Sequence, residues 1–186
     1  MSGRHVCPWW AGYFLASPVR KLRQDPARIL QPLVSAGMIV VEPGPGMGFF
    51  TLELARLVGP EGRVVALDVQ PKMIAALRRR AARAGLLDRI DARVAPESTL
   101  ALEGWEDAVD FVLAFAVVHE LPSAATFFAE AARAMKPGAR LLLAEPAGHV
   151  SQDAFAKELA LAAEVGLTAV DRPNVAGSRA AVLQKS

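Results

Sequence analysis

Short apolar runs alternate with amphipathic stretches along most of the chain. The runs are rich in valine, isoleucine, leucine and alanine, as in strands covered on both faces, and lie at 38–41, 63–69, 90–95, 109–122 with its exit loop, and 140–145. Helical spacing of apolar residues falls between them, at 25–36, 51–58, 71–85, 123–136 and 151–165. This order of elements predicts an α/β protein with one sheet and helices on both faces.

Capping residues set the expected helix ends. Asp25-Pro26 opens the first helix, which we expect to reach about Ala36 before Gly37. Pro71 starts the third helix, and a solvated basic face is expected on its outer side, at Arg78, Arg79, Arg80 and Arg83. Ser123 caps a helix whose inward residues are expected to be Phe127, Phe128, Ala131 and Met135, with Lys136-Pro137-Gly138 ending it.

The two ends of the chain differ from its middle. Segments 166–170 and 179–183 are predicted to pair as a hairpin with one strand antiparallel. Residues 1–24 hold two of the three tryptophans and the only tyrosine. We expect this segment to be an arm or lid over a ligand pocket, with Trp10 and Tyr13 near the substrate; packing against the sheet as ordinary core is the alternative. Residues 25–186 then form one domain.

Composition excludes several classes of protein. Apolar residues make up 53% of the 186 residues and charged residues 22%, as in a folded globular protein. The net charge is only +2, and the basic residues form no long run with aromatics, so nucleic acid binding is not favoured. No apolar run reaches the ~18 residues of a membrane span. Contact of the arm with an anionic membrane surface, through its aromatic and basic residues, is the weaker possibility.

Cysteine and histidine are scarce. The one cysteine, Cys7, cannot form an intramolecular disulfide, and it indicates a reducing compartment, the cytoplasm. Pro8 and Gly12 interrupt the apolar stretch that a secretory signal would need. His5 and Cys7 are too few ligands for zinc, and the other two histidines lie far along the chain, so no metal site is expected.

Three alternating glycines follow the first predicted strand. Gly44, Gly46 and Gly48 remove every Cβ from a strand-to-helix turn, so that a ligand can approach the backbone, and they allow the positive φ of a tight turn. The spacing is G-x-G-x-G, with Phe49 where the dinucleotide fingerprint has its third glycine, and no Gly-Lys-Ser/Thr of a P-loop follows. An acidic residue, Glu42, ends the strand.

This acidic residue and loop resemble the first motif of the class I S-adenosylmethionine-dependent methyltransferases, and the chain is similar to their small-molecule, ubiquinone/menaquinone-methyltransferase-like type. The resemblance implies a doubly wound, Rossmann-like seven-stranded sheet, mostly parallel with one antiparallel strand near the C-terminus. It also implies S-adenosylmethionine as cofactor, held by Glu42, Gly44, Pro45, Gly46 and Gly48, and in-line methyl transfer to a small molecule.

A second acidic strand end supports a nucleoside-bearing cofactor. Asp68 ends the run 63–69, twenty positions after Gly48, and a carboxylate there accepts hydrogen bonds from both ribose hydroxyls in nucleotide-binding α/β folds. Val69 follows it in the predicted cofactor site. The alternative is that Asp68 caps the helix that begins near Pro71.

The third and fourth strands supply the remaining cofactor candidates. The family usually has an acidic residue after the third strand that binds the adenine amino group. Here the segment is Ala95-Pro96-Glu97-Ser98, so Glu97 is the candidate, with an ordinary surface glutamate as the alternative. Phe115, at the exit of the fourth strand, is expected to line the cofactor.

The loop after the fourth strand ends in His119-Glu120-Leu121-Pro122, which resembles the H-x-L-P tail of small-molecule methyltransferases. It lacks the Asn/Asp-Pro-Pro-Tyr of enzymes that methylate amino groups of adenine or glutamine. His119 is the candidate general base, or alternatively an organiser of the loop. Glu145 and His149, at the end of the fifth strand, are substrate candidates.

Two other functions stay open at this level. A nicotinamide-dependent oxidoreductase would have to tolerate Phe49 in its glycine loop. A non-catalytic protein that binds the same cofactor would have the same loop without methyl transfer.

Overall fold

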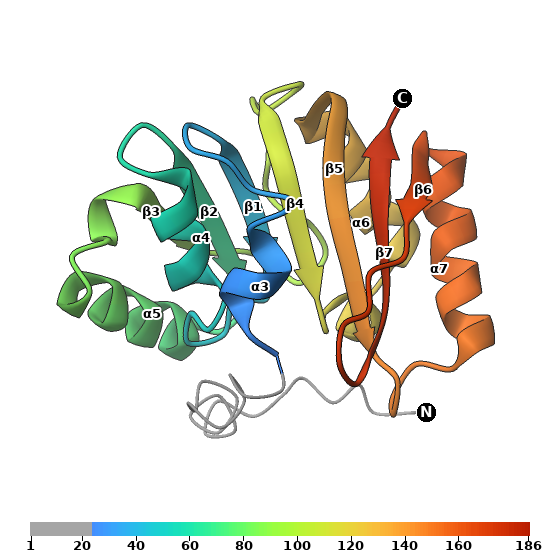
Figure 1. Ribbon diagram of the computed structural model, residues 1–186, viewed down its shortest axis with the longest axis horizontal. Coiled ribbons are helices and arrows are strands. Elements are labelled where there is room, and N and C mark those ends of the chain that lie inside the picture. The colour runs from blue at the N-terminus through green and yellow to red at the C-terminus, as the bar shows by residue number, and fades with distance from the viewer. Residues whose placement is uncertain (1–23) are drawn as a thin grey trace.

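The computed structural model describes residues 24–186, which form a single twisted sheet between two layers of helices (Figure 1). The seven strands lie in the order β3-β2-β1-β4-β5-β7-β6. Their bounds are β1 Ile39–Pro43, β2 Arg63–Asp68, β3 Ile90–Val94, β4 Val109–Phe115, β5 Met135–Pro146, β6 Leu167–Asp171 and β7 Ser178–Lys185. The seven-stranded α/β sheet is therefore confirmed.

Helices cover both faces of the sheet. They are α3 Pro26–Leu30, α4 Thr51–Val58, α5 Pro71–Arg83, α6 Ala124–Ala134 and α7 Gln152–Glu164, with short 3₁₀ turns η1 Leu87–Arg89 and η2 Val118–Glu120. Neighbouring strand residues point to opposite faces, so Val40 packs into the core under α3, α4 and α5, whereas Val41 packs into the core under α6 and α7. None of the helices within residues 24–186 is long and apolar enough to cross a membrane.

One strand runs against the others, as predicted. β7 pairs antiparallel with both β5 and β6, while β1, β2, β3, β4 and β5 are parallel to one another. In the β5–β7 register, Glu145 lies opposite Arg179. The parallel strands therefore end at one edge of the sheet, where ligand sites of doubly wound folds lie.

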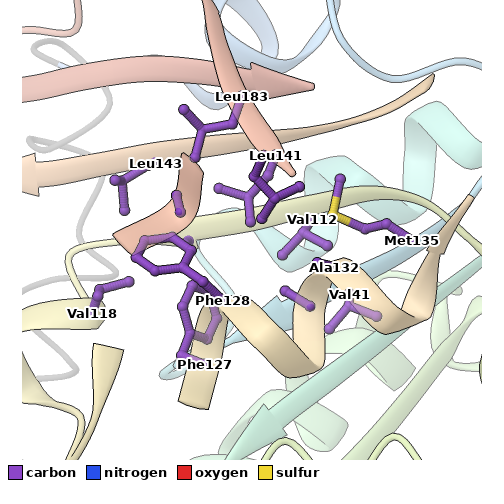
Figure 2. Packing of buried hydrophobic residues seen from close by; sticks show 14 of the residues in the cluster. Val41, Val112, Val118, Phe127, Phe128, Ala132, Met135, Leu141, Leu143 and Leu183 are labelled. Carbon is purple, nitrogen blue, oxygen red and sulfur yellow. The ribbon is translucent and has the colours of Figure 1, made fainter. Parts of the chain in front are cut away.

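The core beneath α6 joins this helix to the centre of the sheet. Figure 2 shows Phe127 and Phe128 of α6 packed against Leu141, Leu143 and other strand residues. The Ser123 cap is confirmed, because its hydroxyl accepts a hydrogen bond from the backbone N–H of Thr126. The helix ends at Ala134, however, so the prediction that Met135 belongs to it was wrong: Met135 is the first residue of β5 and is fully buried.

The first helix is also shorter than predicted. Asp25 does cap it, but α3 ends at Leu30 rather than near Ala36. Pro32 explains the difference, because a proline has no N–H to donate and its ring collides with the carbonyl four residues earlier. Residues 31–33 form turns instead.

Two arginines on the basic face of α5 make hydrogen bonds that hold the helix in place. Arg78 donates from Nη2 to the carbonyl of Ala92 at 2.6 Å, and Arg80 donates to the carbonyl of Met47. Burial lowers the pKa of Arg80. The prediction of a solvated basic face is confirmed at Arg78, Arg79 and Arg83, which are exposed, whereas Arg80 is half-buried. Two of the four arginines also fasten α5 to β3 and to the glycine loop.

Candidate active site

A cavity of about 500 Å³ opens at the carboxyl ends of the parallel strands. Its wall includes the terminal residues of β1, β2, β4 and β5, together with the segment after β3. Most of the side chains and backbone positions expected in the site line this one cavity: Glu42, Gly44, Pro45, Gly46, Asp68, Val69, Glu97, Phe115, His119 and His149.

The three glycines of the loop differ in their surroundings, although all have positive φ: 67° at Gly44, 54° at Gly46 and 85° at Gly48. A Cβ on Gly44 would lie 2.8 Å from Val117, and a Cβ on Gly48 would lie 2.5 Å from Leu77. A Cβ on Gly46 would meet nothing within 4 Å. Gly46 is thus the position where bare backbone faces open cavity.

Gly48 does not line the cavity. It is buried, and its missing side chain lets Leu77 of α5 approach the turn. The structure therefore gives Gly48 a packing role and does not bring it to the ligand space where it was expected.

Asp68 joins the end of β2 to the glycine loop. Its side chain is only 8% exposed, and its two oxygens accept hydrogen bonds from the backbone N–H groups of Gln70 (2.8 Å) and Gly46 (3.3 Å). Burial raises the pKa of the Asp68 carboxyl, and the two backbone hydrogen bonds oppose this shift. The carboxylate thus accepts hydrogen bonds from Gln70, the residue before α5, and from the glycine loop. A capping residue would instead accept hydrogen bonds from the first turn of α5, which Asp68 does not do.

The remaining cofactor candidates surround Asp68. Val69 follows it, Glu97 is an exposed lining residue after β3, and Phe115 is nearly buried with its ring centre 4.4 Å from that of Phe50. Sequence reasoning missed other lining residues, of which Gln70, Met73, Leu100 and Phe127 are examples. Gln70 and Met73 are neighbours of Asp68 in sequence, which is the one signal that pointed to them.

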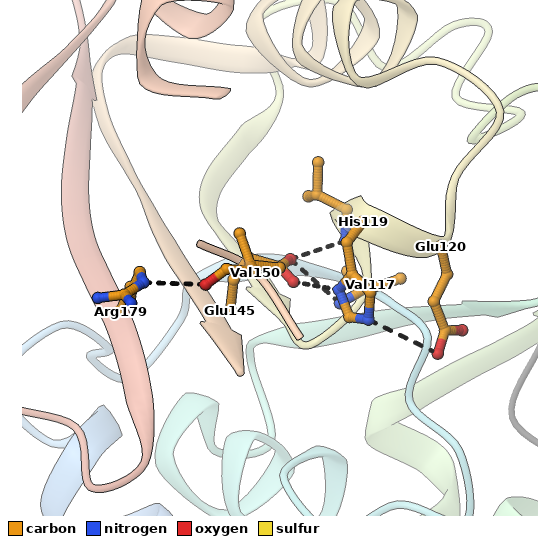
Figure 3. Close-up of polar contacts among 7 residues, drawn as sticks. Val117, His119, Glu120, Glu145, Val150 and Arg179 are labelled. Carbon is orange, nitrogen blue, oxygen red and sulfur yellow. Dashed lines mark hydrogen bonds and ion pairs between the residues drawn. The ribbon is translucent and has the colours of Figure 1, made fainter. Parts of the chain in front are cut away.

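A histidine–carboxylate pair, His119 and Glu145, lies where the loop after β4 meets the end of β5 (Figure 3). Nδ1 of His119 contacts Oε2 of Glu145, and Nε2 lies on the other side of the ring, 4.0 Å from Oε1 of Glu120. The hydrogen bond to Glu145 raises the pKa of His119, neighbouring carboxylates act in the same direction, and burial opposes them. The His119 side chain is 21% exposed and lines the cavity.

Glu145 is fully buried and does not reach the cavity. Its Oε1 accepts hydrogen bonds from the backbone N–H groups of Val118 (2.8 Å) and Val117 (3.3 Å), while Oε2 contacts His119. The structure therefore places Glu145 behind His119, where it orders the loop and the ring, and not against a substrate as expected. His149 does line the cavity, with its ring centre 6.0 Å from that of His119.

A second carboxyl group, which sequence reasoning missed, lies behind this pair. Glu158 of α7 is 8% exposed, and its Oε2 has no hydrogen-bond partner among the described residues. Burial raises the pKa of Glu158 to about 7, the charge of Glu145 adds to this shift, and His119 opposes it. The helical period contained a signal for this burial, because Glu158 follows Phe155 by three residues and precedes Ala162 by four.

Glu158 should make stability depend on pH. Its folded-state pKa of about 7 exceeds the ordinary 4.5, so its contribution to stability is complete below pH 4.5 and is lost as pH rises through 7. We expect Glu158→Gln to be more stable than the parent by about 3 kcal/mol at pH 8 and nearly equally stable at pH 4.5. Urea unfolding at both pH values measures this difference.

The exposed Glu164, on the same helix, is the control for that experiment. Glu164→Gln should leave the free energy of unfolding unchanged at both pH values. A stability difference between Glu158→Gln and the parent that is the same at pH 4.5 and pH 8 would contradict the expectation.

Backbone strain also marks the site. Ala116, directly after β4, has φ 55°, in the left-handed region where a residue with a Cβ costs about 1 kcal/mol. Its N–H donates to the carbonyl of Ala144 at 2.7 Å, which holds the turn in place. The turn directs residues 117–120 toward the cavity.

Two residues of the predicted substrate site, Trp10 and Tyr13, lie outside the described residues. Within residues 24–186, no three His, Asp or Glu side chains come together in a way that could hold a metal ion.

The sheet order, the glycine turn after β1 and the buried acid at the end of β2 define a Rossmann-like protein with a nucleotide-type ligand site. Residues 34–176 match the methyltransferase domain family, so the chain belongs to this family. A solved structure of a SAM-dependent methyltransferase from Aquifex aeolicus has the same fold, with a TM-score of 0.86 and 24% identity over 97% of this chain and all of that one.

Curated relatives match shorter stretches. A catechol O-methyltransferase of Mycobacterium tuberculosis is 47% identical over 57 residues, 31% of this chain and 26% of that protein. A ubiquinone/menaquinone biosynthesis C-methyltransferase of Marinomonas sp. is 29% identical over 117 residues, 63% of this chain and 46% of that protein. The chain thus spans about half or less of the length of these relatives.

Proposed function

We propose that the chain is an S-adenosylmethionine-dependent methyltransferase that acts on a small molecule. The observation that carries this proposal is the single cavity in which the bare backbone of Gly46 meets the carboxylate of Asp68. Family membership supports methyl transfer over hydride transfer. The donor carries its methyl group on a positively charged sulfur, so the protein has mainly to hold donor and acceptor in line.

We assign each part of the methyl donor to residues that line the cavity. The loop from Gly44 to Gly46 holds the amino-acid tail beside Glu42, which is 3% exposed, and the Asp68 carboxylate accepts from the ribose hydroxyls. Val69, Glu97 and Phe115 lie around the adenine. This assignment places the reacting methyl between the donor site and the His119 end of the cavity.

A small acceptor suits this cavity, because about 500 Å³ must hold both donor and acceptor. Two relatives carry names for methylation of a catechol oxygen and of a quinone-precursor carbon, which supports a small organic acceptor here. We assign general-base catalysis to His119, since it lines the cavity and its Nε2 is on the side of the ring away from Glu145. We further propose that residues 25–186 form the methyltransferase domain and that residues 1–24 form an aromatic arm or lid, with Trp10 and Tyr13 near the substrate. The cytoplasmic location remains a prediction from the single Cys7.

Calorimetry with S-adenosylmethionine and with NAD tests the choice of ligand. We expect the methyl donor to bind and NAD not to bind; binding of NAD alone would overturn the proposal. Incubation with tritiated donor and a metabolite extract then tests catalysis. A transferase labels one or a few small molecules, whereas a protein that only binds the donor labels none.

A further inference from the structure

The cavity wall is acidic. Residues 24–186 contribute five carboxylates to it, Glu42, Asp68, Glu97, Glu120 and Glu130, and no lysine or arginine. A cationic methyl donor is attracted to such a wall, whereas an anionic acceptor is repelled and meets no lysine or arginine on it among residues 24–186. The charge pattern therefore disfavours acceptors that carry a carboxylate, sulfate or phosphate.

The same wall also disfavours amines. A carboxylate near an amine stabilises its protonated form, which has no lone pair with which to attack a methyl group. Glu120 lies close to the acceptor end, because its Oε1 is 4.0 Å from Nε2 of His119. An amine bound there would be held as ammonium.

A neutral hydroxyl group is the acceptor that suits the surroundings of His119. Around His119 the wall is mostly apolar, with Val117, Leu121, Pro122 and Phe127 among its members. His119 lines this space, and the buried Glu145 contacts its Nδ1, so that Nε2 is on the side of the ring away from Glu145. This arrangement suits the removal of a proton from a hydroxyl, because the imidazolium that forms is paired at once with a buried carboxylate.

We propose that the methyl acceptor is a neutral, largely apolar compound that is methylated on a hydroxyl oxygen, with His119 as the base and Glu145 as the residue that positions it; this rests on the methyltransferase function proposed above. The acceptor oxygen bonds to the methyl carbon as the carbon–sulfur bond breaks and its electron pair stays on sulfur. The hydroxyl proton passes to Nε2 of His119. The products are a methyl ether, a neutral thioether and a protonated histidine that returns its proton to water.

Glu145 does not line the cavity, so it acts through the residues that it holds, His119 and the loop after β4. It holds the ring through Nδ1 and holds the loop through the N–H groups of Val117 and Val118. The titratable groups that face His119 are Glu120 on its own loop, Glu145 at the end of β5, His149 after β5 and Glu158 on α7. Of these, Glu145 makes the direct contact with Nδ1.

The acceptor class can be tested without knowing the acceptor. A metabolite extract is separated by ion exchange into anionic, neutral and cationic fractions, and each is incubated with the enzyme and a donor whose methyl group carries ¹³C and tritium. We expect at least ten times more label in products of the neutral fraction than in the other two, with the methyl on oxygen by NMR. Label mainly in anionic or amine products, or on carbon, overturns the acceptor proposal alone. No label in any fraction overturns the transferase function itself.

A variant and its control test the role of His119. His119→Gln should lower the turnover of the neutral fraction at least ~100-fold, and the surface variant Glu164→Gln should leave it unchanged, while calorimetry shows unchanged donor affinity in both. Equal losses in the two variants would overturn the role of His119.

The positioning role of Glu145 has a readout independent of turnover. The chain has three histidines, so NMR titration of the donor-free protein can follow His119 directly. Glu145→Gln should lower the pKa of His119 and move the acid limb of the rate profile to lower pH, whereas Glu164→Gln on the outer surface should change neither. An unchanged His119 titration overturns the positioning role. If Glu145→Gln does not fold, Glu145→Asp, which keeps the charge but shortens the reach, should lower turnover and leave donor affinity unchanged; unimpaired turnover there overturns it equally.

Discussion

Replacement of Asp68 by asparagine is expected to weaken binding of S-adenosylmethionine by about 10- to 100-fold, because the donor loses charge-assisted hydrogen bonds from two ribose hydroxyls. Asparagine keeps the shape of the side chain and one acceptor oxygen, but its NH₂ group faces the backbone N–H of either Gly46 or Gln70. Calorimetric titration with the donor measures the loss.

Asp88 provides the control, since it is an exposed aspartate in η1 and lies outside the cavity. Asp88→Asn should bind the donor like the parent protein. Thermal unfolding of both variants shows whether the fold is kept. Unchanged donor affinity in a folded Asp68→Asn protein would remove the basis for the whole donor assignment.

Gly46→Ala is expected to lower donor affinity at least ~10-fold with only a modest loss of stability. An added Cβ at Gly46 meets no protein atom within 4 Å, so it costs little in packing and instead fills space at the cavity wall that the donor needs. The positive φ of 54° adds a strain of about 1 kcal/mol for alanine. Affinity is measured by calorimetry and stability by urea unfolding.

Gly85 separates these two effects. It has a similar φ of 65°, and a Cβ there also meets nothing within 4 Å, but it does not line the cavity. Gly85→Ala should therefore lose a similar ~1 kcal/mol of stability and keep its donor affinity. Equal affinities in the two variants would mean that the donor does not approach the backbone at Gly46.

Local sequence patterns predicted most of the elements because each depends on nearby residues. The apolar run before the glycines could only be a buried strand, and the capping residues Asp25 and Ser123 begin helices as expected. The predicted length of the first helix was wrong because Pro32, a local helix-ending signal, stops it early. Met135 was misplaced because helical spacing and the start of a buried strand look alike over one residue.

Residue roles were predicted less well where they depend on distant contacts. Gly48 has the sequence context of a ligand-binding glycine, yet it makes room for Leu77, which is 29 positions away. Glu145 ends a strand, as a substrate-binding acid would, yet it points beneath the loop and holds His119 from β5. Arg80 looks like a surface cation, yet it binds the carbonyl of Met47.

The sequence by itself determined the class of the molecule: an α/β sheet with a glycine turn and two acidic strand ends, since hydrophobic period, turn chemistry and caps act over a few residues. Only the tertiary structure decided which acid faces the cavity and which is buried behind it. Asp68 and Glu145 both end strands, and no local signal separates them. The difference arises when the sheet order sets β5 beside β4, so that the carboxylate of Glu145 meets the loop of β4.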